Sequence, residues 1–222
     1  DVVKYAEDLS KKYKNRFSFK IGKFSNLLNL VQSQNVKKIV GIVFDLGLSN
    51  LQIFRASRGF SFKLKGPLDM RMSKSGETAC EFINDVDEQY LVKILYEYGD
   101  EQHAKKIARK IVNERKKNNI SNTYDLAELV RSAIPGKKFK IDKATKTFQA
   151  IRMYINQELN ELQLGLIAAE KILSTGGILA VVSFHSKEDK IVKKFLQKCS
   201  GKSLFYRSKF FPQEKNTKQS FE

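Results

Sequence analysis

The sequence has few of the residues that build metal centres, because its 222 residues include only two cysteines and two histidines. Cys80 and Cys199 lie far apart and show no metal-ligand spacing, so we expect two reduced thiols and no metal site. There is no apolar run of about 18 residues, which predicts that no helix spans a membrane. The N-terminus is acidic and polar, unlike a signal peptide, and we therefore expect a cytoplasmic protein.

The sequence also lacks several short motifs of common enzyme classes. Neither G-x-x-x-x-G-K-[ST] nor G-x-G-x-x-G is present, so no loop of these types cradles a nucleotide phosphate. G-x-S-x-G is absent too, and a serine hydrolase with a nucleophile elbow is not expected. The chemistry of the chain must therefore come from other residues.

Acidic residues are scarce relative to basic ones, with 24 acids against 41 Lys and Arg and a net charge of +17. Residues 100–150 contain 13 basic and 6 acidic side chains, and residues 190–222 contain 9 and 2. Two basic regions on a nearly neutral remainder favour a polyanion as the partner, because clustered Lys and Arg neutralise phosphates. A general lysine-rich composition is the alternative explanation.

The hydrophobic pattern at the start of the chain alternates between helix and strand. Residues 1–13 have helical spacing, residues 17–22 predict a short strand, and a second helix opens near Ser25 as its N-cap. Residues 39–45 predict a strand that is apolar on both faces, as parallel central strands are. This order predicts an α/β fold with a doubly wound, Rossmann-like sheet.

The pattern then becomes helical for a long stretch, with one break at Gly99–Asp100. No strand is visible between Arg71 and Leu173, which is far longer than a normal crossover and predicts a helical insertion. We therefore expect a sheet domain in two parts, residues 1–76 and 145–222, separated by an inserted helical domain at residues 77–144.

The return to the sheet begins with one long amphipathic helix, Thr145–Leu173, which a C-cap at Gly176–Gly177 would close. Residues 177–184 predict the next buried strand, and residues 187–198 predict a helix. Residues 203–211 alternate enough to predict an edge strand.

Two of the expected strands end on polar side chains. The first ends on Asp45, and the second runs into Ser183, His185 and Ser186. In a parallel sheet both ends open onto the same edge, where such sheets bind ligands. His185 is suited to act as a base or a positioning group. The alternative is a capping role, with Ser186 as N-cap and Asp189 at the third helical position.

An irregular loop of about twenty residues follows Asp45, and such loops in compact domains are uncommon and mostly functional. Its basic and aromatic residues are suited to hydrogen-bond to and stack on an extruded base; these are Arg58, Phe60, Phe62 and Arg71. The alternative is a loop that simply packs on the sheet edge.

Five segments closely resemble one family: DLGLSNLQ (45–52), RGFSF (58–62), GPLDMRM (66–72), FQAIRMYINQEL (148–159) and VVSFHSKEDKIVKKF (181–195). In sequence and in order they are similar to the MraW/RsmH family, methyltransferases that modify the N4 amine of a cytidine in 16S ribosomal RNA. The resemblance implies a Rossmann-like class I methyltransferase sheet with an inserted helical domain. It also implies S-adenosyl-L-methionine as cofactor and the small ribosomal subunit as partner, without membrane or metal.

The resemblance implies roles for individual residues as well. Phe24, Asp45 and Gln52 would contact the cofactor. The residues that would bind the substrate are Arg58, Phe60, Phe62, Arg71, Ser183 and Ser186. We further expect Asp45 or Asp69 to accept the amine proton, with His185 positioned nearby.

Compared with the family, the chain lacks the Gly-rich loop and the ribose-binding acid that would precede Asp1, and it lacks the basic C-terminal tail. Two other functions therefore stay open. One is a non-catalytic RNA-binding fragment, and the other is a methyltransferase for nucleosides or other small molecules. The sequence also leaves open whether the chain is a monomer or a homodimer.

Overall fold

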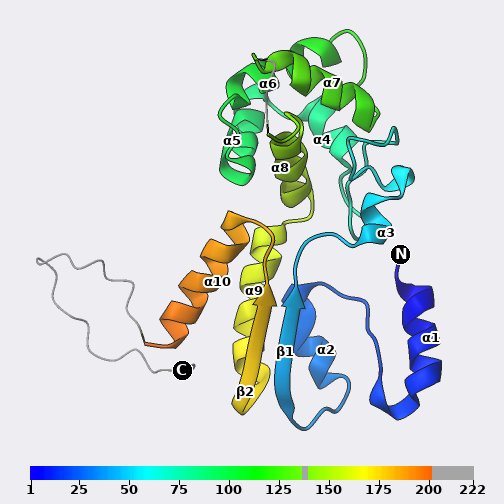
Figure 1. Ribbon diagram of the computed structural model, residues 1–222, viewed down its shortest axis with the longest axis vertical. Coiled ribbons are helices and arrows are strands. Elements are labelled where there is room, and N and C mark those ends of the chain that lie inside the picture. The colour runs from blue at the N-terminus through cyan, green and yellow to red at the C-terminus, as the bar shows by residue number, and fades with distance from the viewer. Residues whose placement is uncertain (137–139, 202–222) are drawn as a thin grey trace, which may run out of the picture. The chain divides into compact units, whose positions relative to one another are not determined.

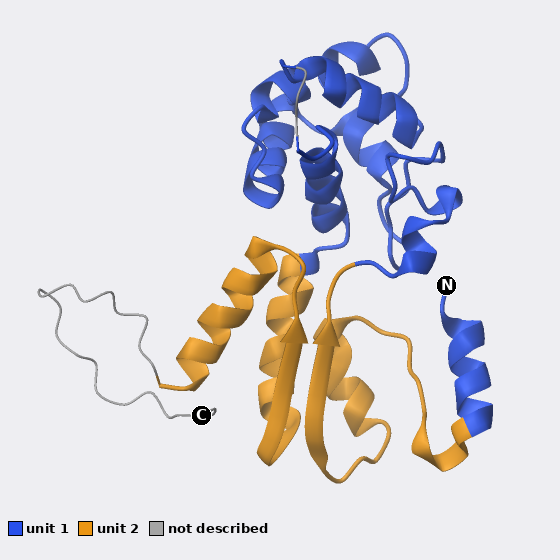
Figure 2. Ribbon diagram, in the orientation of Figure 1, with its two compact units in different colours: residues 1–12, 48–158 blue, residues 13–47, 159–222 orange. Residues whose placement is uncertain are grey.

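The computed structural model describes residues 1–136 and 140–201 of the chain, which form two compact units (Figure 2). We call residues 1–12 and 48–158 the helical unit, and residues 13–47 with the described residues from 159 onward the α/β unit. In the part of the chain that is described, no helix is both long enough and apolar enough to cross a membrane.

The α/β unit is built on two parallel strands, β1 (Ile39–Asp45) and β2 (Leu173–Val182) (Figure 1). Asp45 pairs with Val182, so the two strands end side by side. The helices of the unit are α2 (Leu27–Gln32), α9 (Glu158–Ile172) and α10 (Ser186–Cys199), with short 3₁₀ turns η1 (Lys14–Arg16) and η2 (Phe24–Asn26). One face of the sheet is covered: Phe44 is buried against Leu166 of α9, and side chains of α2 and α10 pack on the same cluster.

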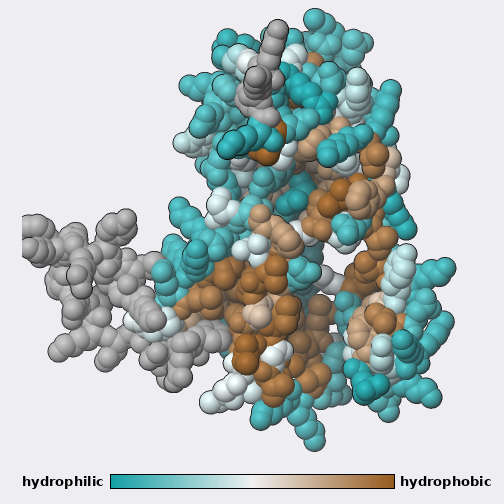
Figure 3. Space-filling model, in the orientation of Figure 1, coloured by the Kyte–Doolittle hydropathy of each residue, from teal (hydrophilic) through white to brown (hydrophobic). Residues whose placement is uncertain are grey.

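The other face of this sheet is exposed. Val43 is 71% exposed and Ile178 is 72% exposed, and Figure 3 shows apolar surface over the two strands. The strand predicted at residues 39–45 is apolar on both faces, but the expectation that it is buried on both faces, as a central strand is, is wrong for the described residues. Only the side chains that alternate toward the helices, such as Ile42 and Phe44, are shielded from water.

Three local predictions for this unit are wrong. Residues 17–22 form no strand, because the sheet of the described residues contains only β1 and β2 and leaves them without a partner. Ser25 is not an N-cap: α2 follows Asn26, and the Ser25 N–H and hydroxyl both donate to the Glu161 carboxylate. Gly176–Gly177 is not a C-cap either, because α9 ends at Ile172 and both glycines lie within β2.

The helical unit has one apolar core. Its helices are α4 (Ala79–Asp85), α5 (Glu88–Gly99), α6 (Ala104–Arg115), α7 (Thr123–Ala133) and α8 (Thr145–Ile155), with the short α3 (Asn50–Ile53) and η3 (Ala56–Arg58) before them. α1 (Val3–Tyr13) begins the chain. Leu91, Leu95, Ile107, Ile111 and Ile151 are fully buried in this core. The expected break between α5 and α6 at Gly99–Asp100 is confirmed, and no strand lies between Arg71 and Leu173 in the described residues.

The expected single helix Thr145–Leu173 is two helices, and the prediction is wrong at their junction. α8 ends at Ile155, and Gln157 takes a left-handed backbone conformation with φ of 50° before α9 continues. The Asn156 side chain bonds to the backbone of the 70–72 loop at this point. These bonds stabilise a non-helical geometry that the continuous apolar pattern does not reveal.

The domain boundaries expected from the sequence, after residues 76 and 144, remain predictions. The compact units are divided elsewhere, between residues 47 and 48 and between residues 158 and 159. The expected edge strand at residues 203–211 lies outside the described residues.

Candidate functional site

Two polar strand ends lie side by side in the α/β unit. The backbone N–H of Leu46, just after Asp45, donates to the carbonyl of Val182 at 3.1 Å, which holds the two chain segments together past the last pair of the ladder. The Asp45 side chain is exposed, and Ser183, the residue after β2, is half-buried. An exposed carboxylate at the carboxyl end of a parallel strand stands where open α/β sheets bind ligands.

His185 and Glu188 close the first turn of α10. The Glu188 N–H donates to His185 Nδ1 at 3.3 Å, the Phe184 N–H donates to Glu188 Oε2 at 2.9 Å, and His185 Nε2 lies 3.2 Å from Glu188 Oε1. Both ring nitrogens of His185 therefore face Glu188, with its backbone N–H at Nδ1 and its carboxylate beside Nε2. Glu188, only 3% exposed, therefore fixes the ring in one orientation.

The capping role considered for this segment is present, but at different residues. His185 is the N-cap, not Ser186, and Glu188 is the third helical residue, not Asp189. The cap expected at Ser186 and Asp189 is therefore wrong. Ser186 is exposed at the start of α10.

Phe24 lies on the covered face of the sheet. Its ring packs against Phe44, with centroids 5.0 Å apart, and a Cβ placed on Gly165 of α9 would lie 2.8 Å from the Cβ of Phe24. The neighbouring Ser25 bonds to Glu161 of the same helix. Since Phe44 and Asp45 are consecutive strand residues, their side chains point to opposite faces. The η2 turn is thus anchored to α9 on the face opposite the Asp45 carboxylate.

Arg58 is the anchor of the loop in the helical unit. It is 6% exposed, its Nη2 donates to the carbonyls of Arg71 and Met72 at 2.8 and 3.0 Å, and its Nε lies 3.0 Å from the Asp1 carboxylate. Burial lowers the pKa of the Arg58 guanidinium, while the Asp69 carboxylate acts in the opposite direction. One buried side chain therefore joins the RGFSF and DMRM segments.

The two phenylalanines of the loop pack inside the helical unit rather than on the sheet edge. Phe60 is 8% exposed within the core, and the Arg58 guanidinium lies 5.6 Å from its ring centroid. Phe62 is half-buried and meets Phe148 of α8 edge to face, with centroids 5.4 Å apart. Both rings hold the loop against helices. The sequence suggested either stacking on a base or packing on the sheet edge, and neither interpretation included helices.

Asp69 and Arg71 form a closed ion pair at the surface of this loop. Asp69 Oδ1 accepts from the Arg71 N–H at 2.9 Å and from Nε at 3.0 Å, and Oδ2 accepts from Nη2 at 2.8 Å. Arg71 Nη1 also donates to the Gly76 carbonyl at 2.9 Å. Burial alone would raise the pKa of the Asp69 carboxyl, but the hydrogen bonds from Arg71 outweigh it, and the pKa lies below its ordinary value.

This ion pair makes the free energy of unfolding depend on pH in a direction that can be predicted. Because the folded-state pKa of Asp69 is lowered, the pair stabilises the fold above the unfolded-state pKa of about 3.9 and loses that effect as the pH falls through the folded-state value. Both side chains are about a fifth exposed, so we expect an effect below about 1 kcal/mol. Urea unfolding near pH 5 and near pH 3 should show a larger acid loss for the unmodified chain than for Asp69→Asn. Equal losses of stability between pH 5 and pH 3 in the two chains would contradict this prediction.

Gln52 stands in a capping box at the start of α3. Its Oε1 accepts from the Ser49 N–H at 3.0 Å, and the Ser49 hydroxyl accepts from the Gln52 N–H at 3.3 Å. The carbonyl end of the Gln52 amide is thus used locally, and its side-chain N–H groups are the end that can donate to a ligand.

Asn156 is a structural residue of the loop that the sequence did not single out. Its Oδ1 accepts from the Met72 N–H at 2.7 Å, and its Nδ2 donates to the Met70 carbonyl at 2.8 Å. Asn156 lies within the FQAIRMYINQEL segment, so that motif is the signal that could have pointed to it. It clamps a loop in which Met70, fully buried, has a left-handed φ of 59°.

The parallel sheet, its flanking helices and its polar strand ends, with a separate helical unit, define a Rossmann-like methyltransferase, as the sequence predicted. A model of the MraW methylase family matches residues 1–220. The chain belongs to the MraW methylase family, so the family predicted from the motifs is confirmed.

Curated relatives give the same result. The chain is 50% identical over 197 residues to a protein of Wolbachia sp. subsp. Drosophila simulans, covering 88% of this chain and 67% of the relative. It is 50% identical over 210 residues to one from Rickettsia bellii, covering 95% and 68%, and 44% identical over 223 residues to one from Anaplasma marginale, covering 99% and 77%. All three are named "Ribosomal RNA small subunit methyltransferase H". The chain spans about two thirds of the length of the first of these relatives.

Proposed function

We propose that the chain transfers a methyl group from S-adenosyl-L-methionine to the N4 amine of a cytidine in 16S ribosomal RNA, in the cytoplasm. The observation that carries the proposal is the exposed Asp45 carboxylate beside the end of β2, in a member of a methylase family. The names of the relatives, which act on small-subunit ribosomal RNA, support the substrate class.

The residues at the strand ends fit the proposed cofactor. S-adenosyl-L-methionine presents hydroxyl and amine donors and positive charge, and an exposed carboxylate such as Asp45 accepts from donors and attracts cations. We propose that Asp45 contacts the cofactor at the end of β1. Phe24, which packs on Phe44 on the opposite face of the sheet, and Gln52, whose side-chain N–H groups can donate, are the other two proposed cofactor contacts. When bound, the cofactor supplies the methyl group.

The chain's own residues would then orient the amine and receive its proton. The lone pair of a cytosine N4 amine is delocalised into the ring, so a carboxylate that accepts its N–H makes the nitrogen more nucleophilic. We propose Asp45 for this step. Asp69 is less suited to it, because Arg71 occupies both of its oxygens and lowers its pKa.

We propose positioning roles for the remaining residues. His185 is held in place by Glu188 and so presents a fixed surface at the end of β2, next to Ser183 and Ser186. Arg71 would contact the substrate with its orientation set by Asp69, while Arg58, Phe60 and Phe62 would keep the substrate-binding loop in shape. Correct orientation of the reacting groups supplies a large part of the rate in such a transfer.

Methylation of small-subunit RNA tests the proposal. We expect Asp45→Asn to reduce transfer of labelled methyl groups about 100-fold or more, because loss of a positioned acid–base group has effects of that order. Asp8→Asn is the matched control, since Asp8 is an exposed carboxylate on α1. Full activity of Asp45→Asn would remove Asp45 from the mechanism.

A second candidate function is RNA binding without catalysis. It is favoured by one observation, that about a third of the length of the first curated relatives lies outside the region they share with this chain. Calorimetric titration of the chain with S-adenosyl-L-methionine separates the two candidates. Measurable heat of cofactor binding supports the methyltransferase. No measurable heat, together with retained RNA binding, supports the second candidate.

A further inference from the structure

The helical unit presents an unusually basic helix surface. α6 and the turn that follows carry Lys105, Lys106, Arg109, Lys110, Lys116 and Lys117, all exposed, and we call these six residues the α6 basic stripe. Lys116 continues the helical conformation as C-cap, and the Lys117 N–H still donates to the Glu114 carbonyl. At 3.6 residues per turn, the six cations fall within an arc of about 140° on one side of the helix.

The opposite side of α6 packs into the core of the helical unit. Ile107, Ala108 and Ile111 are 0% exposed in the core of the helical unit. α6 therefore shows water only its charged and amide side chains. Its orientation in the unit is fixed by packing, so the stripe is held in place as a rigid surface.

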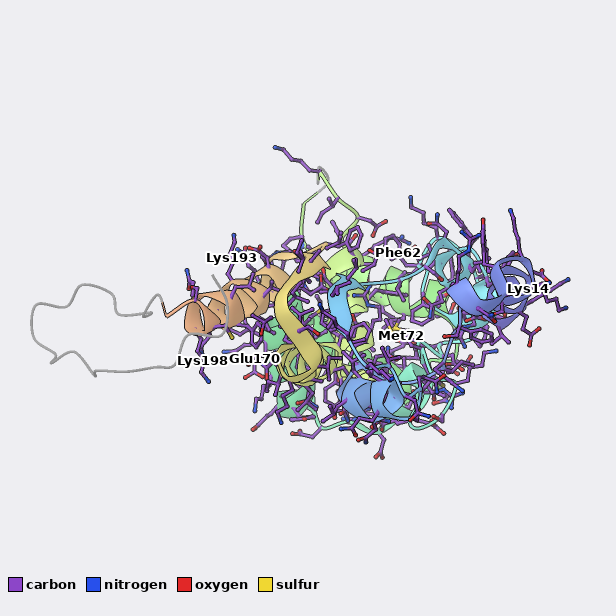
Figure 4. The ribbon with its side chains drawn as sticks, turned by 90° about the horizontal axis from the view of Figure 1, so that it is seen from below. Lys14, Phe62, Met72, Glu170, Lys193 and Lys198 are labelled. Carbon is purple, nitrogen blue, oxygen red and sulfur yellow. The ribbon has the colours of Figure 1, made fainter. Side chains whose placement is uncertain are left out.

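The stripe carries little compensating negative charge. Arg109 lies 3.8 Å from Glu88, and Lys117 lies 4.0 Å from Glu114, with both cations more than two thirds exposed. Within the described residues, Lys105, Lys106 and Lys110 form no ion pair. α10 differs, because Lys193 pairs with Asp189 at 2.8 Å; Figure 4 labels Lys193 and Lys198 along that helix.

This arrangement does not serve the stability of the helix itself. Lys105 and Lys106 stand in the first turn, where the helix dipole disfavours cations, and no acid is present in that turn. The pairs Lys105–Arg109 and Lys106–Lys110 are like charges four residues apart, and such pairs destabilise a helix. A row of cations that is kept at a local cost points to an anionic partner.

We infer that the α6 basic stripe binds the phosphate backbone of the RNA substrate; the inference rests on the proposed function. Lys and Arg that neutralise phosphates release counterions, and this release supplies most of the affinity for a nucleic acid backbone. A membrane surface fits less well, because it would need apolar side chains among the cations, and those of α6 are buried. A protein partner fits less well too, because the centres of protein interfaces are depleted of Lys.

Salt-dependent RNA binding by the full chain tests the inference. The variant Lys105→Gln/Lys106→Gln/Lys110→Gln keeps good helix formers, and Lys20→Gln/Lys37→Gln/Lys38→Gln is a control with the same charge change at exposed sites of the α/β unit. The probe is a fluorescently labelled single-stranded RNA of mixed sequence, followed by anisotropy over a range of KCl concentrations. Circular dichroism of each variant establishes that the helices are intact.

We expect the slope of log affinity against log salt to fall by about 2 in the α6 variant, since each lost phosphate contact on single strands removes about 0.7. Affinity at low salt should fall at least tenfold, whereas the control keeps its slope. The corresponding triple Lys→Arg variant should bind as the unmodified chain does. An unchanged slope in the α6 variant, or equal losses in both Gln variants, would overturn the inference.

Two further outcomes separate this inference from the proposed function. A chain that methylates nothing, yet loses RNA affinity in the α6 variant, keeps the inference and rejects the function. A chain that methylates, but binds RNA equally in both Gln variants, rejects the inference alone. Loss of binding to phosphatidylserine vesicles without loss of binding to RNA would also overturn it, in favour of a membrane surface.

Discussion

Replacing Arg58 with methionine is expected to lower the free energy of unfolding by about 3–5 kcal/mol, the range for removing one partner of a buried ion pair. The substitution leaves the carbonyls of Arg71 and Met72 without the donor they share, and it leaves the Asp1 carboxylate, 6% exposed, without its nearest cation. Methionine fills a similar volume, so the loss reports hydrogen bonds and charge rather than a cavity. Urea unfolding followed by circular dichroism measures it.

Arg55→Met is the matched control for this prediction. Arg55 also pairs with Asp1, at 3.4 Å, but its side chain is 52% exposed. An exposed pair contributes about 0–1 kcal/mol, so the control should lose little. Similar small losses in both variants would show that the loop does not depend on the buried guanidinium.

Gly59→Ala is expected to destabilise the chain by about 2 kcal/mol or more beyond Gly76→Ala. Both glycines have left-handed φ values, 70° and 84°, so both variants share the strain that a Cβ brings to that conformation. A Cβ on Gly59 would also lie 2.4 Å from the Pro67 carbonyl oxygen and 2.6 Å from the Asp69 nitrogen, whereas nothing lies within 4 Å at Gly76. Both close atoms belong to the backbone, so relief requires the loop itself to move.

The comparison is made by urea unfolding of the two variants and by hydrogen exchange at residues 66–72. Faster exchange there in Gly59→Ala, but not in Gly76→Ala, is the expected local signature, because residue 59 touches that segment directly. Two variants of equal stability would mean that the loop accommodates the extra methyl group and is less rigid than its contacts indicate.

Arg58 and Gly59 matter for the proposed function because several independent contacts fix the shape of the loop they belong to. Arg58 joins its ends, Asn156 clamps its last turn, and Thr123 of α7 accepts from the Gly66 N–H at 3.1 Å and donates to the Leu64 carbonyl at 2.6 Å. Such support can hold Met70 in a left-handed conformation that costs about 1–3 kcal/mol. A loop held this firmly presents Asp69 and Arg71 in one arrangement, which is what selective binding of one base requires.

The family, the presence of β1 and the helical character of residues 77–134 could be predicted from the sequence alone. These features are written in contiguous residues. The RGFSF and GPLDMRM segments are recognised directly from consecutive residues. The buried residues of α5, α6 and α7 recur every three to four positions along the chain. Local pattern suffices where the interactions that form an element are themselves local.

Features that depend on residues far apart in the sequence could be seen only in the three-dimensional structure. Asn156 ends α8 because it bonds to Met72, 84 positions earlier, and Arg58 is buried because Asp1 and the 71–72 carbonyls surround it. Phe60 is buried because it packs in the core of the helical unit, among residues distant in the sequence. One face of β1 is exposed because no described element covers it. Hydrophobic periodicity does not indicate which residues far apart in the sequence contact each other in the fold. It therefore could not predict where these side chains lie.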